Sequence, residues 1–429
     1  MKGPNLGLMI LAAVLLLFAI GGSAYAFHSG GVAECVGCHS MHSPQDTTVG
    51  ALLINSDQSS TCLSCHLAAA GTTAPSSYHV ATADADMPTG KAPIQRTPGG
   101  DFGWLHKTYT FTVRGTVTTE TGDSHGHNII AADFGYTKDA TNSTAPGGTF
   151  PSSQLACNSC HDQHGKMRRL SDGSINSVGG PIIASGSYNN SPTPAAGQAV
   201  GVYRLLRGNL SSTATAAAGA NYPGVPAAVA PSTYNQSEAT NQVRVAYGVA
   251  TGANQSTWGH WCGTCHPNMH STGNYVHPVD QMLSTTLLAN YNAYVSSGVM
   301  TGTAAKSFLS LVPFTTNKGD FTSLAGLANN NNSNLNGPVS GDQVNCLSCH
   351  RAHASGFPNG LRWASGGEFL TYVDGSGNPA WPGTDTTPSV PQFAMGRLGA
   401  ETMAAYYDRP VTTFGAYQRA LCNKCHAQD

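Results

Sequence analysis

Charge is the scarcest property of this chain. Only 10% of its 429 residues are Asp, Glu, Lys or Arg, and the formal net charge is -2. Globular proteins usually carry about 25% charged residues. So low a charge excludes a basic nucleic-acid-binding protein, a polyelectrolyte tail and a coiled coil laced with salt bridges. We therefore expect no nucleic-acid partner.

Long apolar runs are equally rare, and the clearest one occupies residues 6–20. It follows Lys2 and precedes Ala24-Tyr25-Ala26, which is the cleavage pattern of a secretory signal peptide. The run is also shorter than the roughly 20 residues that cross a bilayer. The sequence therefore predicts a signal peptide over residues 1–26 and a single exported body over residues 27–429.

Cysteine and histidine are present in excess, with 12 Cys and 17 His. An exported protein with this many cysteines normally carries disulfides. Here every cysteine belongs to a C-x-x-C-H motif, the signal for covalent attachment of haem c, in which two thiols bond the haem and the adjacent His ligates the iron. Motifs 1 to 6, in chain order, are Cys35/Cys38/His39, Cys62/Cys65/His66, Cys157/Cys160/His161, Cys262/Cys265/His266, Cys346/Cys349/His350 and Cys422/Cys425/His426. The sequence predicts six covalent haems, six proximal histidines and no structural disulfide.

The 50 Gly and 24 Pro favour turns over long regular elements. We expect an elongated, mostly irregular fold with short α-helices and little β-structure, in which the haems form the core. Apolar spacing predicts helices within residues 281–296, 303–311, 401–407 and 412–424, and short helical turns at the motifs. Residues 109–113 and, more weakly, 243–247 are expected to be strands, and residues 211–232 and 329–341 to be loops.

The second axial ligands must come from the histidines outside the motifs. His42, His164 and His353 each stand three residues after a proximal histidine, and His270 stands four after His266. Residues three or four apart lie on one side of a helical turn, whereas two axial imidazoles face each other through the haem. We therefore expect His42, His164 and His353 each to ligate a haem other than the one attached at the adjacent motif. The alternative is a hydrogen bond to a haem propionate.

The remaining distal positions are predicted from context. His79 and His127 are expected to be distal ligands, His277 is preferred to His270, and His28 is a further candidate. His106, His125 and His260 are expected to be exposed or bonded to propionates, and Met41 and Met269 to pack against haem faces. The propionates are expected to pair with Arg168, Arg169, Arg204, Arg207, Arg351 and Arg419.

Several stretches resemble the OmcS family of six-haem outer-surface cytochromes of metal-reducing bacteria. They are residues 27–35 (FHSGGVAEC), 38–42 (CHSMH), 97–104 (TPGGDFGW), 227–235 (AAVAPSTYN), 345–356 (NCLSCHRAHASG) and 417–426 (YQRALCNKCH). The resemblance covers the exported chain and all six motifs.

This resemblance implies a function as well as a cofactor. Members of the family polymerise head to tail into filaments that carry respiratory electrons outside a Gram-negative cell. They receive electrons from other cytochromes and deliver them to metal oxides or partner cells. The resemblance also implies that His42 ligates the motif 5 haem of the adjoining subunit, and that the protein is not an enzyme.

Two alternatives stay open. A soluble periplasmic electron shuttle would carry the same motifs. A multihaem reductase would need an iron with an open face, often marked by C-x-x-C-K, which none of the six motifs shows.

Overall fold

The structure is a computed structural model, and it describes residues 35–42, 44–45, 52–209, 222–235, 237–271 and 277–427, with the side chains of residues 270–271 left out. The expected signal peptide and His28 lie outside these residues, as does the side chain of His270. Within the described chain, no helix is long and apolar enough to cross a membrane.

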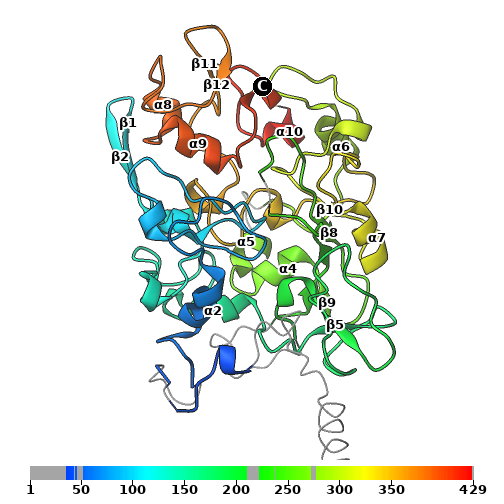
Figure 1. The fold of residues 1–429 in the computed structure, drawn as a ribbon. Coiled ribbons are helices and arrows are strands. Elements are labelled where there is room, and N and C mark those ends of the chain that lie inside the picture. Colours follow the sequence, from blue (N-terminus) through cyan, green and yellow to red (C-terminus); the bar gives the residue numbers. More distant parts are fainter. Residues whose placement is uncertain are drawn as a thin grey trace, which may run out of the picture.

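Coil connects many short elements, as Figure 1 shows. The helices are α2 Gln58–His66, α3 Cys157–Cys160, α4 Trp258–Gly263, α5 Pro267–Ser271, α6 Thr285–Ala293, α7 Phe321–Leu327, α8 Pro391–Ala394, α9 Gly399–Ala405 and α10 Asn423–His426. The strands are β1 Tyr109–Val113, β2 Thr116–Glu120, β3 Arg168–Leu170, β4 Ile175–Asn176, β5 Ala199–Gly201, β6 Val225–Pro226, β7 Ala228–Val229, β8 Ala246–Gly248, β9 Gln255–Ser256, β10 Thr315–Thr316, β11 Tyr372–Val373 and β12 Pro379–Ala380. The predicted fold, mostly irregular with short helices and little β-structure, is confirmed.

The longest ladder is the antiparallel hairpin β1–β2, which confirms the strand expected over residues 109–113. It turns through Arg114 and Gly115, whose φ angles of 51° and 81° are both positive. Two consecutive positive φ values match a tight hairpin turn that follows the natural twist of the strands. Tyr109 pairs with Glu120 at the base, and both are buried, so the hairpin is held by that end.

The other sheets join segments that are remote in sequence. Their strand orders are β4-β3-β5, β10-β8-β7, β6-β9 and β11-β12. Strand β8 begins at Ala246, so the strand expected over residues 243–247 is largely displaced towards the C-terminus. The loop expected over residues 211–232 contains β6 and β7 in its described part, and that expectation was wrong there.

Two of the four helix predictions are confirmed and two are wrong. Helix α6 lies within residues 281–296, and α9 overlaps residues 401–407. Residues 303–311 form only the short turn Ala304–Lys306, because the backbone of Phe308 donates to Leu335 O across the fold. Most of residues 412–424 is not helical either, since the Leu370 N–H donates to Gln418 O, and the Gln418 N–H donates to Thr371 Oγ1. In both segments the backbone forms hydrogen bonds with residues distant in sequence in place of the local hydrogen bonds of a helix.

The apolar core is rich in aromatic side chains and borders the motifs. In the larger cluster, Trp104, Trp363 and Tyr406 are almost completely buried, and motif cysteines such as Cys349 pack against the cluster. A second cluster contains Trp258 and Trp261 and touches Cys160 and Cys262. The aromatic clusters therefore help to wall the places where haem would be attached.

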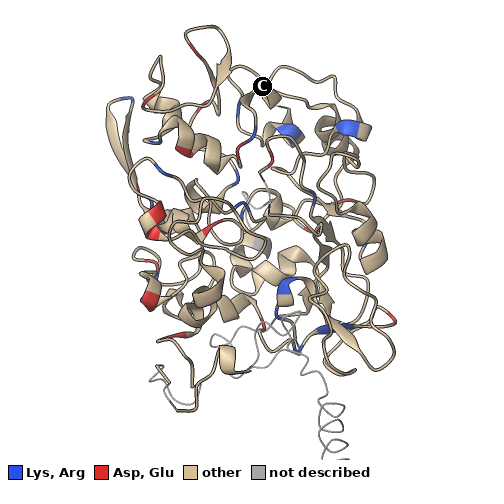
Figure 2. Ribbon diagram, in the orientation of Figure 1, with Lys and Arg blue, Asp and Glu red and all other residues tan. Residues whose placement is uncertain are grey.

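Charged residues are few and scattered along the ribbon, most of which is uncharged (Figure 2). Many of the cations are nevertheless inside the protein. Ten basic side chains of the described chain are buried: Arg96, Lys107, Arg169, Arg207, Arg244, Arg351, Arg362, Arg397, Arg409 and Lys424. The buried acidic side chains number six: Asp101, Glu120, Asp162, Glu238, Asp342 and Glu401. The interior of the described protein thus holds more basic than acidic groups.

Candidate haem-binding sites

Each C-x-x-C-H motif begins or lies on a helical turn, as expected. Motifs 2, 3 and 6 lie on α2, α3 and α10, motif 4 runs from α4 towards α5, and motifs 1 and 5 start with the 3-10 turns Cys35–Gly37 and Cys346–Ser348. Helix α2 shows why such a turn forms: Asp57 caps it by accepting a hydrogen bond from Ser60 N at 2.8 Å. One helical turn brings both cysteines and the histidine of a motif to the same place.

The motif histidines are oriented by the backbone. The Nδ1 atoms of four proximal histidines lie 2.7 or 2.8 Å from carbonyl oxygens: His66 from Tyr78 O, His161 from Arg204 O, His266 from Pro146 O and His350 from Asn359 O. A carbonyl oxygen can only accept, so Nδ1 carries the proton and Nε2 keeps its lone pair. This is the usual arrangement of a metal-ligating histidine. The rings are thus prepared to bind iron through Nε2.

Four proximal histidine rings face a second histidine from elsewhere in the chain. The ring centroids are 6.4 Å apart for His39 and His164, 6.3 Å for His161 and His353, 6.0 Å for His127 and His266, and 6.3 Å for His277 and His426. With metal–nitrogen bonds of about 2 Å on each side, two imidazoles on one metal place their centroids about 6 Å apart. The spacing leaves room for one haem between each pair.

The histidine of motif 2 lies near His79. Burial lowers the pKa of His79, and repulsion from His66 lowers it further, which places the two rings within electrostatic range. The Tyr78 ring contacts the His79 ring, with the centroids 4.2 Å apart and the planes inclined by 58°. The Nδ1 atom of His79 is buried and has no hydrogen-bond partner in the described structure.

His350 of motif 5 differs from the other proximal histidines. Among the described residues no second histidine ring faces it, although its Nδ1 is held by Asn359 O at 2.8 Å like those of the others. His42, the expected distal ligand beside motif 1, is exposed, and no other histidine ring of the described chain faces it. His350 is therefore a proximal histidine that no described histidine ring faces, and His42 is an exposed candidate ligand.

The motifs lie next to one another in the order in which they occur in the sequence. Hydrogen bonds join Cys62 to Cys157 and Cys262 to Cys346, linking motif 2 to motif 3 and motif 4 to motif 5. Electrostatic contacts link the remaining neighbours: Cys38 with Cys65, Cys160 with Cys265, and Cys349 with Cys422 and Cys425. First cysteines meet at the 2–3 and 4–5 contacts, second cysteines meet at the 1–2 and 3–4 contacts, and Cys349 meets both cysteines of motif 6. The six motifs form one unbroken series.

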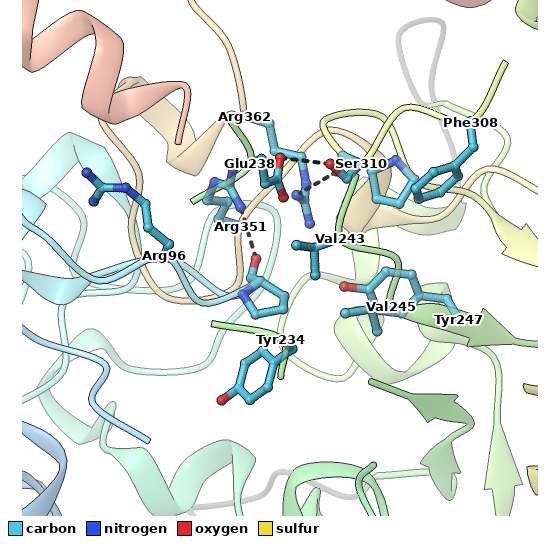
Figure 3. Close-up of a pocket in the computed structure, with 12 residues that line it drawn as sticks. Arg96, Tyr234, Glu238, Val243, Val245, Tyr247, Phe308, Ser310, Arg351 and Arg362 are labelled. Carbon is cyan, nitrogen blue, oxygen red and sulfur yellow. Dashed lines mark hydrogen bonds between the residues drawn. The ribbon is translucent and has the colours of Figure 1, made fainter. Parts of the chain in front are cut away.

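The excess of buried cations fits the carboxylates that haem would bring. Arg351 is 3% exposed, and its Nε and Nη2 atoms have no hydrogen-bond partner in the described structure. Figure 3 shows Arg96, Arg351 and Arg362 around a cavity, which is also lined by the acidic residue Glu238. Burial lowers the pKa of Arg351 to about 9, as expected for a cation without a close anion. Haem propionates are anions of the kind that such arginines bind.

Arg169 and Arg204 belong to the same class. Each has a buried Nη2 atom without a partner in the described chain, and each was expected to meet a propionate. Arg204 is surrounded by tyrosines, with its guanidinium 3.9 Å from the Tyr234 ring centroid and 4.7 Å from that of Tyr188. The carbonyl oxygen of Arg204 also binds Nδ1 of His161, so this partly buried arginine contacts a proximal histidine.

Three histidines were expected to be exposed or bonded to propionates, and the structure corrects this for His125. His125 is fully buried; its Nδ1 lies 2.8 Å from Trp104 O and its Nε2 lies 2.7 Å from Glu120 Oε1. His106 stacks on Tyr136 with the centroids 4.3 Å apart, and its Nδ1 binds Asp84. Protein groups thus bind both ring nitrogens of His125. The buried Nε2 of His106 has no hydrogen-bond partner in the described structure, so its bond to a propionate stays a prediction. His260 is exposed, as expected.

The C-x-x-C-H turns, whose histidines are oriented by the backbone, define a c-type cytochrome with covalently bound haem c. The opposed histidine rings and the buried arginine nitrogens without hydrogen-bond partners fit the same class. No protein-family model matches the chain. C-type cytochrome OmcS of Geobacter sulfurreducens is 50% identical over 447 residues, which cover 100% of both chains. The chain therefore belongs to the OmcS family of c-type cytochromes, and the resemblance seen in the sequence is confirmed.

Two solved structures agree with this assignment. They are the OmcS nanowires and the Outer Membrane Cytochrome S filament, both of Geobacter sulfurreducens. Each is 48% identical in sequence and has a TM-score of 0.84, and each match covers 94% of this chain and 100% of the other.

Proposed function

We propose that this protein carries respiratory electrons outside the cell as the repeating subunit of a filament, along six haem c groups attached one to each motif. The observation that carries the proposal is the unbroken series of the six motifs in space. A haem attached at each motif supplies reversible one-electron chemistry. The protein's own part is to hold these groups close together, to fix their ligands and to shield them from water.

Four axial pairs follow from the opposed histidine rings, and the fifth, His66 with His79, follows from the electrostatic effect of His66 on His79. Proximal and distal ligands are assigned as His39 with His164, His66 with His79, His161 with His353, His266 with His127, and His426 with His277. His277 takes the position for which His270 was the competing candidate. Two histidines on each iron favour low reduction potentials compared with a His/Met pair.

The histidines three residues after a motif obey a simple rule. His164, beside motif 3, faces the histidine of motif 1, and His353, beside motif 5, faces the histidine of motif 3. Each therefore reaches the motif two places earlier. Applied to His42 beside motif 1, the rule leads out of the subunit to motif 5 of the preceding one. His350 of motif 5 is the proximal histidine that no described histidine faces.

A bond from His42 to the motif 5 iron of a second copy would close each contact between subunits. Such a contact joins different surfaces of two identical chains, so it repeats without limit unless the rotation closes a ring. The solved relatives are described as nanowires and a filament, which supports this assembly for the present chain. We place the filament on the outer cell surface, with other cytochromes as donors and metal oxides or partner cells as acceptors.

Electron transfer, and not a bond-making reaction, is the function that this arrangement favours. The five pairs assigned within the subunit and the His42 link give every iron two protein ligands, which leaves no face open to a substrate. The chain after residue 26 is proposed to work as one body, since consecutive motifs touch along its whole described length. A soluble shuttle would need no ligand shared between subunits.

The test combines mass, spectroscopy and microscopy on the native protein. Intact mass should equal the chain from Phe27 plus six haems, and the oxidised protein should be low-spin throughout. Negative-stain images should show long filaments. Monomers with six low-spin haems would support the shuttle instead, and rapid carbon monoxide binding to one haem would support a reductase.

A further inference from the structure

Motif 6 is the only one of the six with a charge between its cysteines. The two intervening residues are Val-Gly, Leu-Ser, Asn-Ser, Gly-Thr and Leu-Ser in motifs 1 to 5, and Asn423-Lys424 in motif 6. A lysine on a helical turn normally extends into water. Lys424 is instead only 3% exposed, although its turn, α10, ends near the C-terminus of the described chain.

The Lys424 side chain points into the contact between α10 and α6. Its Nζ donates to Tyr291 O at 3.1 Å and to Tyr294 O at 3.2 Å, and it lies 4.2 Å from the centroid of the Tyr291 ring. Asn290 Nδ2 donates to Cys425 O at 2.8 Å and fixes the same two helices together. Figure 1 shows α6 and α10 close together at one end of the body. The ammonium group is thus held in one place.

The contacts of Lys424 solvate a cation but do not neutralise it. Carbonyl oxygens and the face of an aromatic ring attract an ammonium group while carrying no net charge. In the described chain no carboxylate forms an ion pair with Lys424. Donation from Nζ to two carbonyl oxygens and its position over the Tyr291 ring both favour the charged ammonium form of Lys424. A fixed positive charge therefore stands beside Cys425 and two residues from His426.

We infer that Lys424 is a potential-setting residue, which raises the reduction potential of the haem attached at motif 6 above the value that its two histidine ligands alone would give. A nearby cation favours the reduced iron, because the reduced iron carries one positive charge less. Two unit charges about 10 Å apart, at an effective dielectric constant of about 20, would change a reduction equilibrium roughly tenfold. A tenfold change in a one-electron couple corresponds to 59 mV.

The position of this haem gives the charge a role, and this part rests on the proposed function. Motif 6 ends the series of motifs within one subunit, so in a filament it meets motif 1 of the next. Lys424 stabilises an electron at that boundary relative to the same site without the charge. The other five motifs have no charged residue between their cysteines, so this adjustment is confined to one site in six.

The experiment is a spectroelectrochemical titration of the purified holoprotein. In Lys424→Gln, which keeps donors for the two carbonyls, and in Lys424→Met, which keeps the length of the chain, one haem's share of the absorbance change should move to lower potential by about the 59 mV of a tenfold shift. Lys424→Arg keeps the charge and should retain the original curve. Haem content and the low-spin spectrum should be unchanged in all three.

Lys107→Met is the matched control. Lys107 is also a buried lysine that donates to a carbonyl, Met87 O at 3.0 Å, but it lies outside every motif and its Nζ is 3.8 Å from Glu401 Oε1. Its loss should leave the potentials unchanged. Folded Lys424→Gln or Lys424→Met protein with the wild-type curve would overturn the inference, as would an equal shift in Lys107→Met. The titration needs no filaments, so a failure to assemble would count against the proposed function alone.

Discussion

The ring of His39 faces the ring of His164 with the two planes only 7° from parallel and the centroids 6.4 Å apart. One histidine belongs to motif 1, and the other stands directly beyond motif 3. The other three opposed pairs are inclined by 54° to 70°. In the proposed assignment, motif 3 provides a proximal histidine for its own haem and His164 provides a distal ligand for the haem of motif 1.

Replacement of His164 by Ala should therefore affect a site to which it is not adjacent. We expect one high-spin iron, at the haem of Cys35 and Cys38, while the haem of Cys157 and Cys160 stays low-spin. Electron paramagnetic resonance would count the high-spin iron, and mass spectrometry would verify six haems. His260→Ala, at an exposed histidine, is the control and should stay fully low-spin. A high-spin iron at motif 3 would refute the cross-site pairing.

Replacement of His42 by Ala should separate folding from assembly. His42 is exposed and not needed for any pair assigned within the subunit, so the variant should load six haems. It should fail to form long filaments and should show one high-spin iron, that of motif 5. Electron microscopy and the spin count check the two parts separately. Normal filaments with every iron low-spin would show that the subunit contact does not use this bond.

Replacement of Gly126 by Ala should disturb two distal histidines at once. A Cβ at Gly126 would lie 2.2 Å from His353 O and 2.6 Å from Ala354 Cα, and His127 is the next residue in the chain. We expect a loss of about 1–3 kcal/mol in stability, typical of overpacking, together with high-spin signal from the haems of motifs 3 and 4. Gly326→Ala, where the new methyl group meets open space in α7, should leave the spectrum unchanged.

Replacement of Glu120 by Gln should destabilise the fold without changing any haem ligand. Glu120 accepts from His125 and Arg397, which are both buried, and removing one partner of a buried ion pair costs about 3–5 kcal/mol. Thermal unfolding, followed by circular dichroism, should show the loss. Glu368→Gln, which removes a half-exposed carboxylate 3.8 Å from Arg419, should change stability by less than about 1 kcal/mol.

The same carboxylate should make the wild-type protein sensitive to acid. Burial alone would raise the pKa of Glu120, but the hydrogen bond from His125 and the charge of Arg397 outweigh it and lower the pKa below 4.5. A depressed pKa contributes stability that is fully present above pH 4.5 and is lost as the pH falls through the lower value. Glu120→Gln should flatten this part of the stability–pH curve, and an unchanged curve would contradict the assignment.

Much of the site was predictable because the chemistry is local. The twelve cysteines, the six proximal histidines and the need for His164 and His353 to leave their own motifs follow from spacing alone. Which motif each would reach did not follow, because it depends on contacts between segments far apart in the sequence. The resemblance to a known family supplied the destination of His42, which stays a prediction, and the pairs of His164 and His353 support it by analogy.

The secondary structure was predictable where side chains act on their own neighbours. The hairpin strand at Tyr109 and the helix at Thr285 were found from local patterns. The predicted helix at residues 412–424 failed because Gln418 bonds to Leu370, Thr371 and Tyr294, and Tyr417 adopts a φ of 55°. His125 was misassigned for a similar reason: its partners Trp104 and Glu120 are revealed only by the folded chain.

In the proposed assignment, His164 and His353 ligate haems attached earlier in the chain, and this fixes the order in which the haem sites can be completed. During export the N-terminal part of the chain emerges first. In this arrangement the haem of motif 1 gains its second ligand only when His164 has emerged, and the haem of motif 3 only when His353 has emerged. In the proposed assembly the site of motif 5 is completed last, because its second ligand, His42, comes from another subunit. The spin state of each iron would therefore report how much of the chain has been exported. The iron of motif 5 would become low-spin only when the subunit joins a second one.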